Sequence, residues 1–237
     1  MLPKIDVVIL CGGSGTRVRS LSEDTPKALL QLDNKTFLER LIFRLKDVRF
    51  NRVILCTGYQ GDLIREYCEK NITGIDIEIS HEEKPLGTGG ALKNAKDLIC
   101  GDDFFLMNGD VLCDLNFSEF YKFYKKKETK LAMAVCKKEK NEDFGSISLD
   151  SNMRILAFRE KEKQANGEFS SAGVYIMNKD VFNFMPKKES FSLEYDFFPN
   201  IIKKPCYGYI IKDDFLDIGT PENFKKAEDW VKRHREY

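Results

Sequence analysis

Hydrophobic and polar positions in the first half of the chain follow two periods, one typical of buried strands and one typical of amphipathic helices. The apolar run at 6–11 predicts a buried strand. Thr36, followed by Glu39 three positions later, is typical of a capping box at the start of a helix. The helix that it predicts, at 36–48, has one apolar face made by Phe37, Leu38, Leu41, Ile42, Leu45 and Val48.

The same alternation continues along the chain as far as residue 107. Strands are expected at 52–57, 76–80 and 104–107, and helices at 62–69 and 91–99. Repeated β-α-β order predicts an α/β fold class, with a mixed, mostly parallel sheet covered by helices on both faces in three layers. Ligands of such sheets bind outside the carboxyl ends of the strands.

From about residue 130 the expected strands follow one another more closely, which indicates an antiparallel or mixed extension of the sheet. These strands are expected at 130–137, 145–149, 154–160 and 170–177. A short helix at 193–203, a strand at 207–217 and a helix at 221–234 that begins with proline complete the prediction.

Composition narrows the class of protein. The 237 residues are 42% hydrophobic, which suffices for a sizeable core, and the 38 basic residues are balanced by 38 acidic ones. No overall charge therefore favours nucleic acid or an anionic membrane. The 7 cysteines form no C-x-x-C pair and there are only 2 histidines, which disfavours a zinc site. Without a signal-like segment or an apolar run of about 18 residues, we expect a soluble, cytoplasmic protein.

A glycine-rich turn follows the first predicted strand. It reads Gly12-Gly13-Ser14-Gly15-Thr16-Arg17, and Pro26-Lys27 comes shortly after it. Glycines let backbone N–H groups approach a phosphate chain, because no Cβ blocks the approach, and Arg17 and Lys27 add positive charge. The turn matches neither the Walker A motif nor the dinucleotide fingerprint. The alternative is a plain glycine turn with two solvated basic residues.

A second glycine cluster and two isolated acids also follow predicted strands. Glu82-Glu83-Lys84-Pro85-Leu86-Gly87-Thr88-Gly89-Gly90-Ala91 opens a helix, and Asn108-Gly109-Asp110 ends a strand. Asp217 interrupts an apolar strand, where an unpaired acid is costly to bury. Mg²⁺ prefers one or two carboxylates together with phosphate oxygens and water, so a metal ion would explain both aspartates. The alternatives are solvated glutamates, glycines that merely cap a helix, and a helix-capping role for Asp217.

These segments, together with Phe158-Arg159-Glu160-Lys161, Ser171-Ala172-Gly173-Val174-Tyr175 and Ser192-Leu193-Glu194-Tyr195-Asp196, resemble sugar-1-phosphate nucleotidylyltransferases in the family's own order. The similarity is greatest to heptose-1-phosphate guanylyltransferases and weaker to mannose-1-phosphate guanylyltransferases. The resemblance implies a Rossmann-like nucleotidyltransferase core of glycosyltransferase-A type in one domain over 1–237. Its nucleotide half is expected at about 1–115 and its sugar-phosphate half at about 116–237.

The resemblance also implies roles for particular residues. Arg17 and Lys27 would be catalytic, and Asp110 and Asp217 would bind Mg²⁺. Nucleotide contacts would come from Leu10, Gly12, Gly13, Gly15, Thr16, Glu82, Glu83, Pro85, Gly87, Thr88 and Asn108. Sugar-phosphate contacts would come from Gly145, Glu160, Lys161, Ala172, Gly173 and Glu194. For Glu160 and Lys161 the alternative is a solvated pair within a charged run.

The expected reaction joins GTP to a sugar 1-phosphate, which by resemblance is that of a manno-heptose. Its products are pyrophosphate and a nucleotide-sugar, and the nucleotide-sugar would serve cell-surface polysaccharide synthesis. A carboxylate at Glu82 or Glu83 can accept both N1–H and the amino group of guanine, which uracil and thymine cannot offer. Uridylyl or thymidylyl transfer to a hexose 1-phosphate, a non-catalytic paralogue and a glycosyltransferase stay open as alternatives. No nucleic acid or membrane partner is expected. The identity of the sugar, the role of Arg19 and the oligomeric state, including a homo-oligomer, are left open.

Overall fold

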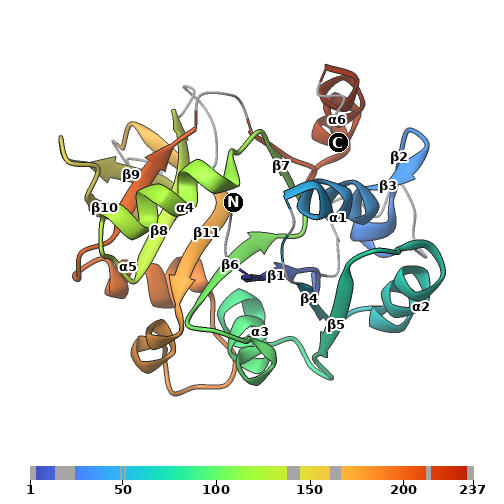
Figure 1. The fold of residues 1–237 in the computed structure, drawn as a ribbon, viewed down its shortest axis with the longest axis horizontal. Helices are drawn as coiled ribbons and strands as arrows, with labels where there is room; N and C mark the ends of the chain where they lie inside the picture. The colour runs from blue at the N-terminus through green and yellow to red at the C-terminus, as the bar shows by residue number, and fades with distance from the viewer. Residues whose placement is uncertain are drawn as a thin grey trace.

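The computed structural model describes residues 4–13, 25–48, 50, 52–137, 145–160, 167–211 and 215–233. In this part of the chain a nine-stranded sheet has the order β10-β9-β11-β6-β1-β4-β5, with β8 paired to β11 and β12 paired to β8. Both halves of the chain contribute strands to it (Figure 1). The strands of this sheet are β1 (Asp6–Leu10), β4 (Arg52–Thr57), β5 (Asp76–His81), β6 (Asp103–Asn108), β8 (Leu131–Lys137), β9 (Ser146–Leu149), β10 (Ile155–Arg159), β11 (Phe169–Asn178) and β12 (Tyr207–Ile210).

Strand direction divides the sheet into two regions. β1 pairs in parallel with β4 and β6, and β4 with β5, so the carboxyl ends of these four strands share one edge. β11 runs antiparallel to β6, with Val174 opposite Met107, so the beginning of β11 lies beside the carboxyl end of β6. A register shift in β11 between Ser171 and Tyr175 falls at this point. The expected mixed sheet is confirmed: it is parallel in the first half and mainly antiparallel in the second.

Helices cover both faces of the sheet. They are α1 (Phe37–Val48), α2 (Gly61–Asn71), α3 (Gly87–Asn94), α4 (Phe117–Lys126), α5 (Phe198–Ile201) and α6 (Pro221–Arg233), with short turns η2 (Lys27–Leu29), η3 (Lys96–Leu98), η4 (Lys179–Phe184) and η5 (Leu193–Phe197). α1, α2 and α4 pack on the face that carries Val7 and Ile9, and α3, η5 and α5 pack on the face that carries Val8. Figure 1 shows α1 and α4 on one side of the sheet and α3 on the other.

A third apolar cluster lies outside the two faces of the sheet. It joins α6, through Trp230, to Leu41 of α1 and to Leu112 and Ile218. The last two residues belong to or follow a small antiparallel pair, β7 (Val111–Cys113) and β13 (Phe215–Asp217). A hairpin of β2 (Gln31–Leu32) and β3 (Lys35–Thr36) packs in the same cluster through Leu32. α6 therefore packs against the strand pair that begins next to Asp110 and ends at Asp217.

Several expected boundaries are wrong. The helix expected at 91–99 begins at Gly87, inside the glycine cluster, because the bare backbone of the glycines packs against another segment. The strand expected at 207–217 is two strands in different sheets, β12 and β13. The helix expected at 193–203 is a π-turn followed by one short α-helix that ends at Ile201. β7, α4 and the β2–β3 hairpin were not predicted at all.

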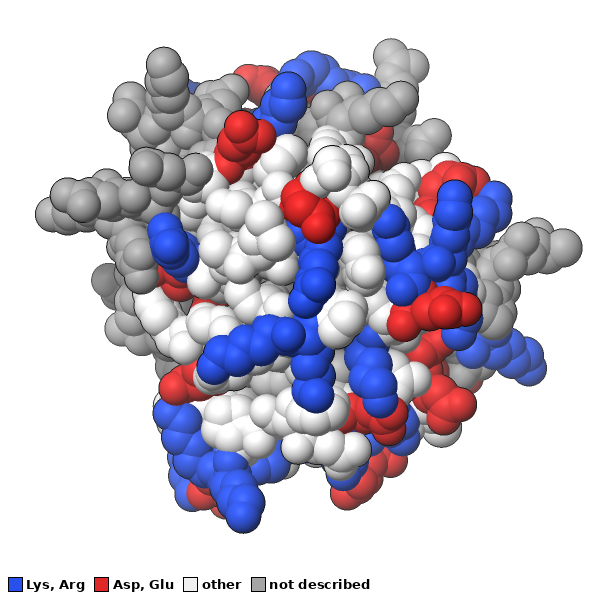
Figure 2. Space-filling model, turned by 90° about the vertical axis from the view of Figure 1, so that its left-hand side faces the viewer, with Lys and Arg blue, Asp and Glu red and all other residues white. Residues whose placement is uncertain are grey.

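The surface shown in Figure 2, on the side of β9, β10 and α4, mixes basic and acidic side chains. Ion pairs such as Lys125–Asp103 (3.1 Å) and the short Lys130–Asp180 contact join elements on the surface. No described helix is both long enough and apolar enough to span a membrane. All seven cysteines are free thiols, and only Cys100 is exposed.

Candidate active site

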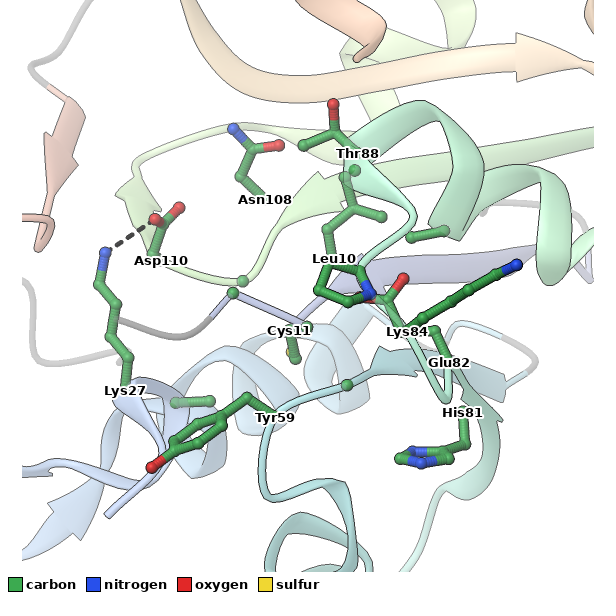
Figure 3. Close-up of a pocket in the computed structure, with 18 of the residues that line it drawn as sticks. Leu10, Cys11, Lys27, Tyr59, His81, Glu82, Lys84, Thr88, Asn108 and Asp110 are labelled. Atoms are coloured by element: carbon green, nitrogen blue, oxygen red, sulfur yellow. Dashed lines mark hydrogen bonds and ion pairs between the residues drawn. The ribbon is translucent and has the colours of Figure 1, made fainter. Parts of the chain in front are cut away.

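A cavity of about 730 Å³ lies at the carboxyl ends of β1, β4, β5 and β6 (Figure 3). Every described residue with a predicted nucleotide role lines it, and Lys27 and Asp110 line it as well. The lining residues are Leu10, Cys11, Gly12, Gly13, Lys27, Ala28, Gly58, Tyr59, His81, Glu82, Glu83, Lys84, Pro85, Gly87, Thr88, Ala91, Asn108, Gly109, Asp110 and Gly219. Residues up to 209 positions apart in the chain, from Leu10 to Gly219, thus form one concave surface.

Lys27 links the two aspartates that sequence analysis assigned to a metal ion. Its Nζ lies 2.8 Å from Asp110 Oδ2 and 3.7 Å from Asp217 Oδ1, and its side chain is only 13% exposed. Figure 3 shows Lys27 reaching across the cavity to Asp110. The buried neighbours Ala28 and Leu29 anchor η2, the turn on which Lys27 stands. The structure therefore brings 27, 110 and 217 together around a single positive charge.

Asp217 reaches this position through the pairing of β13 with β7. Asp217 lies opposite Val111, and the N–H of Ile218 donates to the carbonyl of Asp110 at 2.9 Å. The alternative role of Asp217 as the cap of α6 is wrong, because Thr220 Oγ1 accepts from the Asn223 N–H at 3.2 Å instead. The N–H of Gly219 donates to Asp217 Oδ1, which further orients this carboxylate.

The turn between Asn108 and Asp110 requires a glycine. A Cβ at Gly109 would lie 2.5 Å from the carbonyl oxygen of Leu10 and 2.7 Å from Cys11 Sγ, so no side chain fits there. Asn108 Oδ1 is buried and accepts no hydrogen bond from the described residues. A buried polar atom without a partner is costly, which makes Asn108 Oδ1 a candidate acceptor for a ligand hydroxyl.

Glu82 is half-buried beside the glycine turn. A Cβ at Gly12 would lie 2.9 Å from Glu82 Oε1, and a Cβ at Gly58 would lie 2.7 Å from it. The N–H of Leu86 donates to Glu82 Oε2 at 3.3 Å. Burial raises the pKa of Glu82 above its ordinary value, although the Leu86 N–H and His81 oppose the shift. Glu83, its neighbour, is exposed, so the two glutamates considered together in the sequence differ in environment.

The second glycine cluster is packed against the chain around Phe191. The N–H groups of Gly89 and Gly90 donate to the Phe191 carbonyl at 3.0 and 3.2 Å, and a Cβ at Gly89 would lie 2.2 Å from the Phe191 ring. Gly87 has a φ of +71°, which disfavours other residues, and a Cβ there would meet the Phe191 carbonyl. These glycines thus allow close packing against Phe191. The sequence had predicted only that they let the backbone approach a base.

Acids from both predicted halves of the chain act electrostatically on the buried Tyr175. Burial raises the pKa of the Tyr175 phenol, and the negative charges of Glu194, Glu160 and Asp110 raise it further, against a hydrogen bond from Ser171. Three acids from three segments therefore lie within electrostatic range of one hydroxyl. Glu160 also lies beside Gly145, where a Cβ would be 2.4 Å from Glu160 Oε2.

Ala172 and Gly173 of β11 complete this side of the site. Ala172 is buried, and Gly173 has a φ of +66° beside the end of β6. A Cβ at Gly173 would lie 3.1 Å from Asn108 Nδ2 and 3.2 Å from Val111 Cγ2. Gly173 thus allows β11 to pass close to the Asn108–Asp110 turn.

Comparison with known proteins agrees with this geometry. Residues 6–233 match the family model described as Nucleotidyl transferase. The chain belongs to the nucleotidyl transferase family.

Particular members of the family resemble the whole chain. It is 34% identical over 225 residues to a D-glycero-alpha-D-manno-heptose 1-phosphate guanylyltransferase of Aneurinibacillus thermoaerophilus, covering 94% of this chain and 97% of that protein. The crystal structure of HddC from Yersinia pseudotuberculosis complexed with GMP-PN has a TM-score of 0.81 and 33% identity over 96% of this chain and 99% of that one. An inositol-1-phosphate CTP transferase from T. maritima shares the fold, with a TM-score of 0.82 and 18% identity over 98% of this chain and 97% of that one.

Some predicted residues of this nucleotidyl transferase lie outside the described part of the chain, and some lining residues were not predicted. Gly15, Thr16, Arg17 and Lys161 belong to the first group. The second group includes Gly58, Tyr59 and His81. Gly58-Tyr59 directly follows β4, and His81 ends β5. Extending the rule about carboxyl ends of parallel strands to these two strands would have found all three.

Proposed function

We propose that this chain is a guanylyltransferase that joins GTP to a sugar 1-phosphate, by similarity a manno-heptose 1-phosphate. The observation that carries the proposal is the position of Lys27 between Asp110 and Asp217 at the end of a cavity that also contains Glu82. Similarity to a heptose 1-phosphate guanylyltransferase over 97% of that protein supports the choice of reaction. Because its substrates are nucleotide and sugar phosphates, we also propose that the protein acts in the cytoplasm, for cell-surface polysaccharide synthesis.

The chemistry needs positioning and charge more than a base. A phosphate oxygen of the sugar 1-phosphate, already an anion, attacks the α-phosphorus of GTP, the bond between the α- and β-phosphates breaks, and pyrophosphate leaves with the electron pair. No proton has to be removed from the attacking oxygen. The main barrier is repulsion between two anionic phosphates, and the Lys27 ammonium, which lines the cavity beside Asp110, would reduce it.

The two aspartates fit a magnesium ion by their chemistry. The described residues contain no group of three or more metal-ligating side chains, but Mg²⁺ is usually held by one or two carboxylates and by substrate phosphates. The Lys27 ammonium, 2.8 Å from Asp110 Oδ2 and 3.7 Å from Asp217 Oδ1, supports a cation position between the two carboxylates. Bound there, Mg²⁺ would neutralise charge on the phosphates of the nucleotide.

Glu82 is the candidate reader of the base. An ionised carboxylate accepts two hydrogen bonds from guanine, at N1–H and at the amino group, and it offers no donor that uracil or thymine could use. Burial has already removed part of the water around Glu82, so hydrogen bonds from guanine would replace lost interactions. The exposed Glu83 still has its water and would gain less from the same pairing.

Glu160 and Glu194 are proposed to accept hydrogen bonds from the sugar hydroxyls. The negative charges of Glu160, Glu194 and Asp110 all raise the pKa of Tyr175, which supports a sugar position near the proposed metal-binding carboxylate. Arg17 and Lys161, by family resemblance, would hold the leaving pyrophosphate and the attacking phosphate.

A substrate matrix tests the proposal. Pyrophosphate release would be measured with GTP, ATP, CTP, UTP and dTTP against a panel of sugar 1-phosphates that includes a manno-heptose, and the nucleotide-sugar would be identified by mass spectrometry. We expect turnover with GTP and the heptose, and none with the Asp110→Asn variant. Preference for UTP or dTTP, or binding of a nucleotide-sugar without turnover, would replace the proposed function by one of the alternatives.

A further inference from the structure

The Thr88 side chain forms a hydrogen bond to Glu194 that links the proposed nucleotide region to the proposed sugar region. Thr88 Oγ1 donates to Glu194 Oε2 at 2.7 Å and accepts from the Leu193 N–H at 2.9 Å. A threonine hydroxyl has one proton to donate, so this donor is already used. Figure 3 shows the Thr88 hydroxyl pointing away from Glu82, although the residue lines the cavity.

We propose that Thr88 is a positioning residue that orients Glu194 toward the sugar 1-phosphate, and that its hydroxyl does not bind the nucleotide. This inference rests on the proposed function and changes one expectation from sequence, since Thr88 was expected to contact the nucleotide directly.

Backbone bonds hold the two segments in a fixed relation. The Phe191 N–H donates to the Leu86 carbonyl at 2.9 Å, and Gly89 N–H donates to the Phe191 carbonyl at 3.0 Å. The base-side turn and the segment before η5 therefore pack as one unit. Within this unit Thr88 Oγ1 is the atom of α3 that reaches the Glu194 carboxylate.

The carboxylate of Glu194 is held from one side only. Ser192 Oγ donates to the same oxygen, Oε2, at 2.7 Å. No hydrogen bond from the described residues ends on Oε1, so this oxygen stays available to a sugar hydroxyl. Because two donors fix Oε2, the direction of Oε1 is set before the sugar arrives, which lowers the ordering cost of binding.

The decisive variant is Thr88→Val, which keeps the shape of the side chain and removes the hydroxyl. We expect KM for the sugar 1-phosphate to rise about tenfold, as for the loss of one hydrogen bond to a charged group, with the Kd of GTP within about twofold of wild type. Thr88→Ser keeps the donor and should restore KM. Turnover gives KM, and calorimetry gives the Kd of GTP.

A double-mutant cycle separates orientation of Glu194 from a general structural effect. In a Glu194→Ala background, Thr88→Val should raise KM no further, because its target is gone. If Thr88→Val proves unstable by circular dichroism, Thr88→Ala, which introduces no clash, serves in the same cycle.

Three results would overturn the inference. One is a Thr88→Val variant that weakens GTP binding and leaves the sugar KM unchanged. Another is an unchanged KM and Kd together, and the third is an equal rise of KM in the Glu194→Ala background. A wild-type protein without turnover on any sugar 1-phosphate would instead overturn the proposed function, so the two failures are distinguishable.

Discussion

The amino-end edge and the carboxyl-end edge of the parallel strands carry similar polar side chains in different environments. At the amino ends, Asp6 and Asp103 have partners within the protein. Asp6, 1% exposed, accepts from the Cys100 N–H at 2.7 Å and pairs with Arg52 at 3.3 Å. Asp103 accepts hydrogen bonds from Tyr124 at 2.8 Å and from Asn178 at 3.0 Å.

At the carboxyl ends the polar groups are only partly matched. Asn108 Oδ1 has no partner among the described residues, and Asp110 and Asp217 share one ammonium. The pKa values of Asp103, at the amino end, and Glu82, at the carboxyl end, shift in opposite directions. Burial by itself would raise the pKa of Asp103, but hydrogen bonds from Asn178, Tyr124 and Lys125 outweigh burial and lower it. Burial raises the pKa of Glu82, because its internal partners are too few.

The difference shows how one sheet can be stable and reactive together. Asp6 and Asp103 at the amino ends are satisfied by the fold and stabilise it, whereas Asp110 and Glu82 at the carboxyl ends line the cavity, where a ligand or ion can contact them. Substitutions at the two ends should therefore separate loss of stability from loss of function.

The largest effect is expected at Lys27. Replacement by alanine removes a cation that lines the cavity and contacts Asp110, so kcat should fall about 100-fold or more. Steady-state pyrophosphate release measures the change. Lys125→Ala is the matched control, because Lys125 pairs with Asp103 at the amino end of β6. Near-normal turnover of Lys27→Ala would exclude this role.

Next in size is the loss of stability at Asp6. Asp6→Ala leaves the Cys100 N–H and Arg52 without their buried acceptor, so the free energy of unfolding should fall by about 2–3 kcal/mol while kcat is unchanged. Urea denaturation measures the first quantity and turnover the second. Asp110→Asn should behave in the opposite way, with lost activity and little change in unfolding. Equal stability losses at both positions would contradict the comparison.

A smaller effect, on base recognition, is expected at Glu82. Glu82→Gln should weaken GTP binding about tenfold, because one acceptor for guanine is replaced by a donor. In the wild type, GTP affinity should decrease as the pH falls through the raised pKa of Glu82, since guanine needs the ionised form. Calorimetric titrations across this pH range should show a flat profile for the glutamine variant. The exposed Glu83→Gln serves as control, and a larger effect there would assign base recognition to Glu83.

The smallest effect is expected on metal binding in the absence of nucleotide. The Lys27 ammonium occupies the region between the two aspartates that a metal ion would use. Lys27→Met should therefore bind Mn²⁺ several-fold more tightly than wild type without nucleotide, as electron paramagnetic resonance of free Mn²⁺ would show. Lys125→Met should bind as wild type does. Unchanged or weaker binding by Lys27→Met would mean that the ammonium and the metal do not compete.

Periodicity and local chemistry were enough to predict much of this protein. The alternation of apolar runs predicted β1, β4 and β6 almost to the residue, because buried parallel strands are continuously apolar. The Thr36–Glu39 spacing predicted the start of α1, and the Thr36 hydroxyl accepts from the Glu39 N–H at 3.2 Å. Acids and glycines after strands pointed to the cavity, because carboxyl ends of parallel strands meet at one edge.

Only the tertiary structure decided which partners these residues have. That Glu82 is half-buried beside Gly12 and Gly58 while Glu83 is exposed depends on how β1, β4 and β5 pack side by side. The bond from Thr88 to Glu194 spans 106 positions and has no local signal in the sequence. The same holds for Asp217, which β7 pairing brings to Asp110. Burial and long-range hydrogen bonds are properties of packing, and local patterns in a sequence do not contain them.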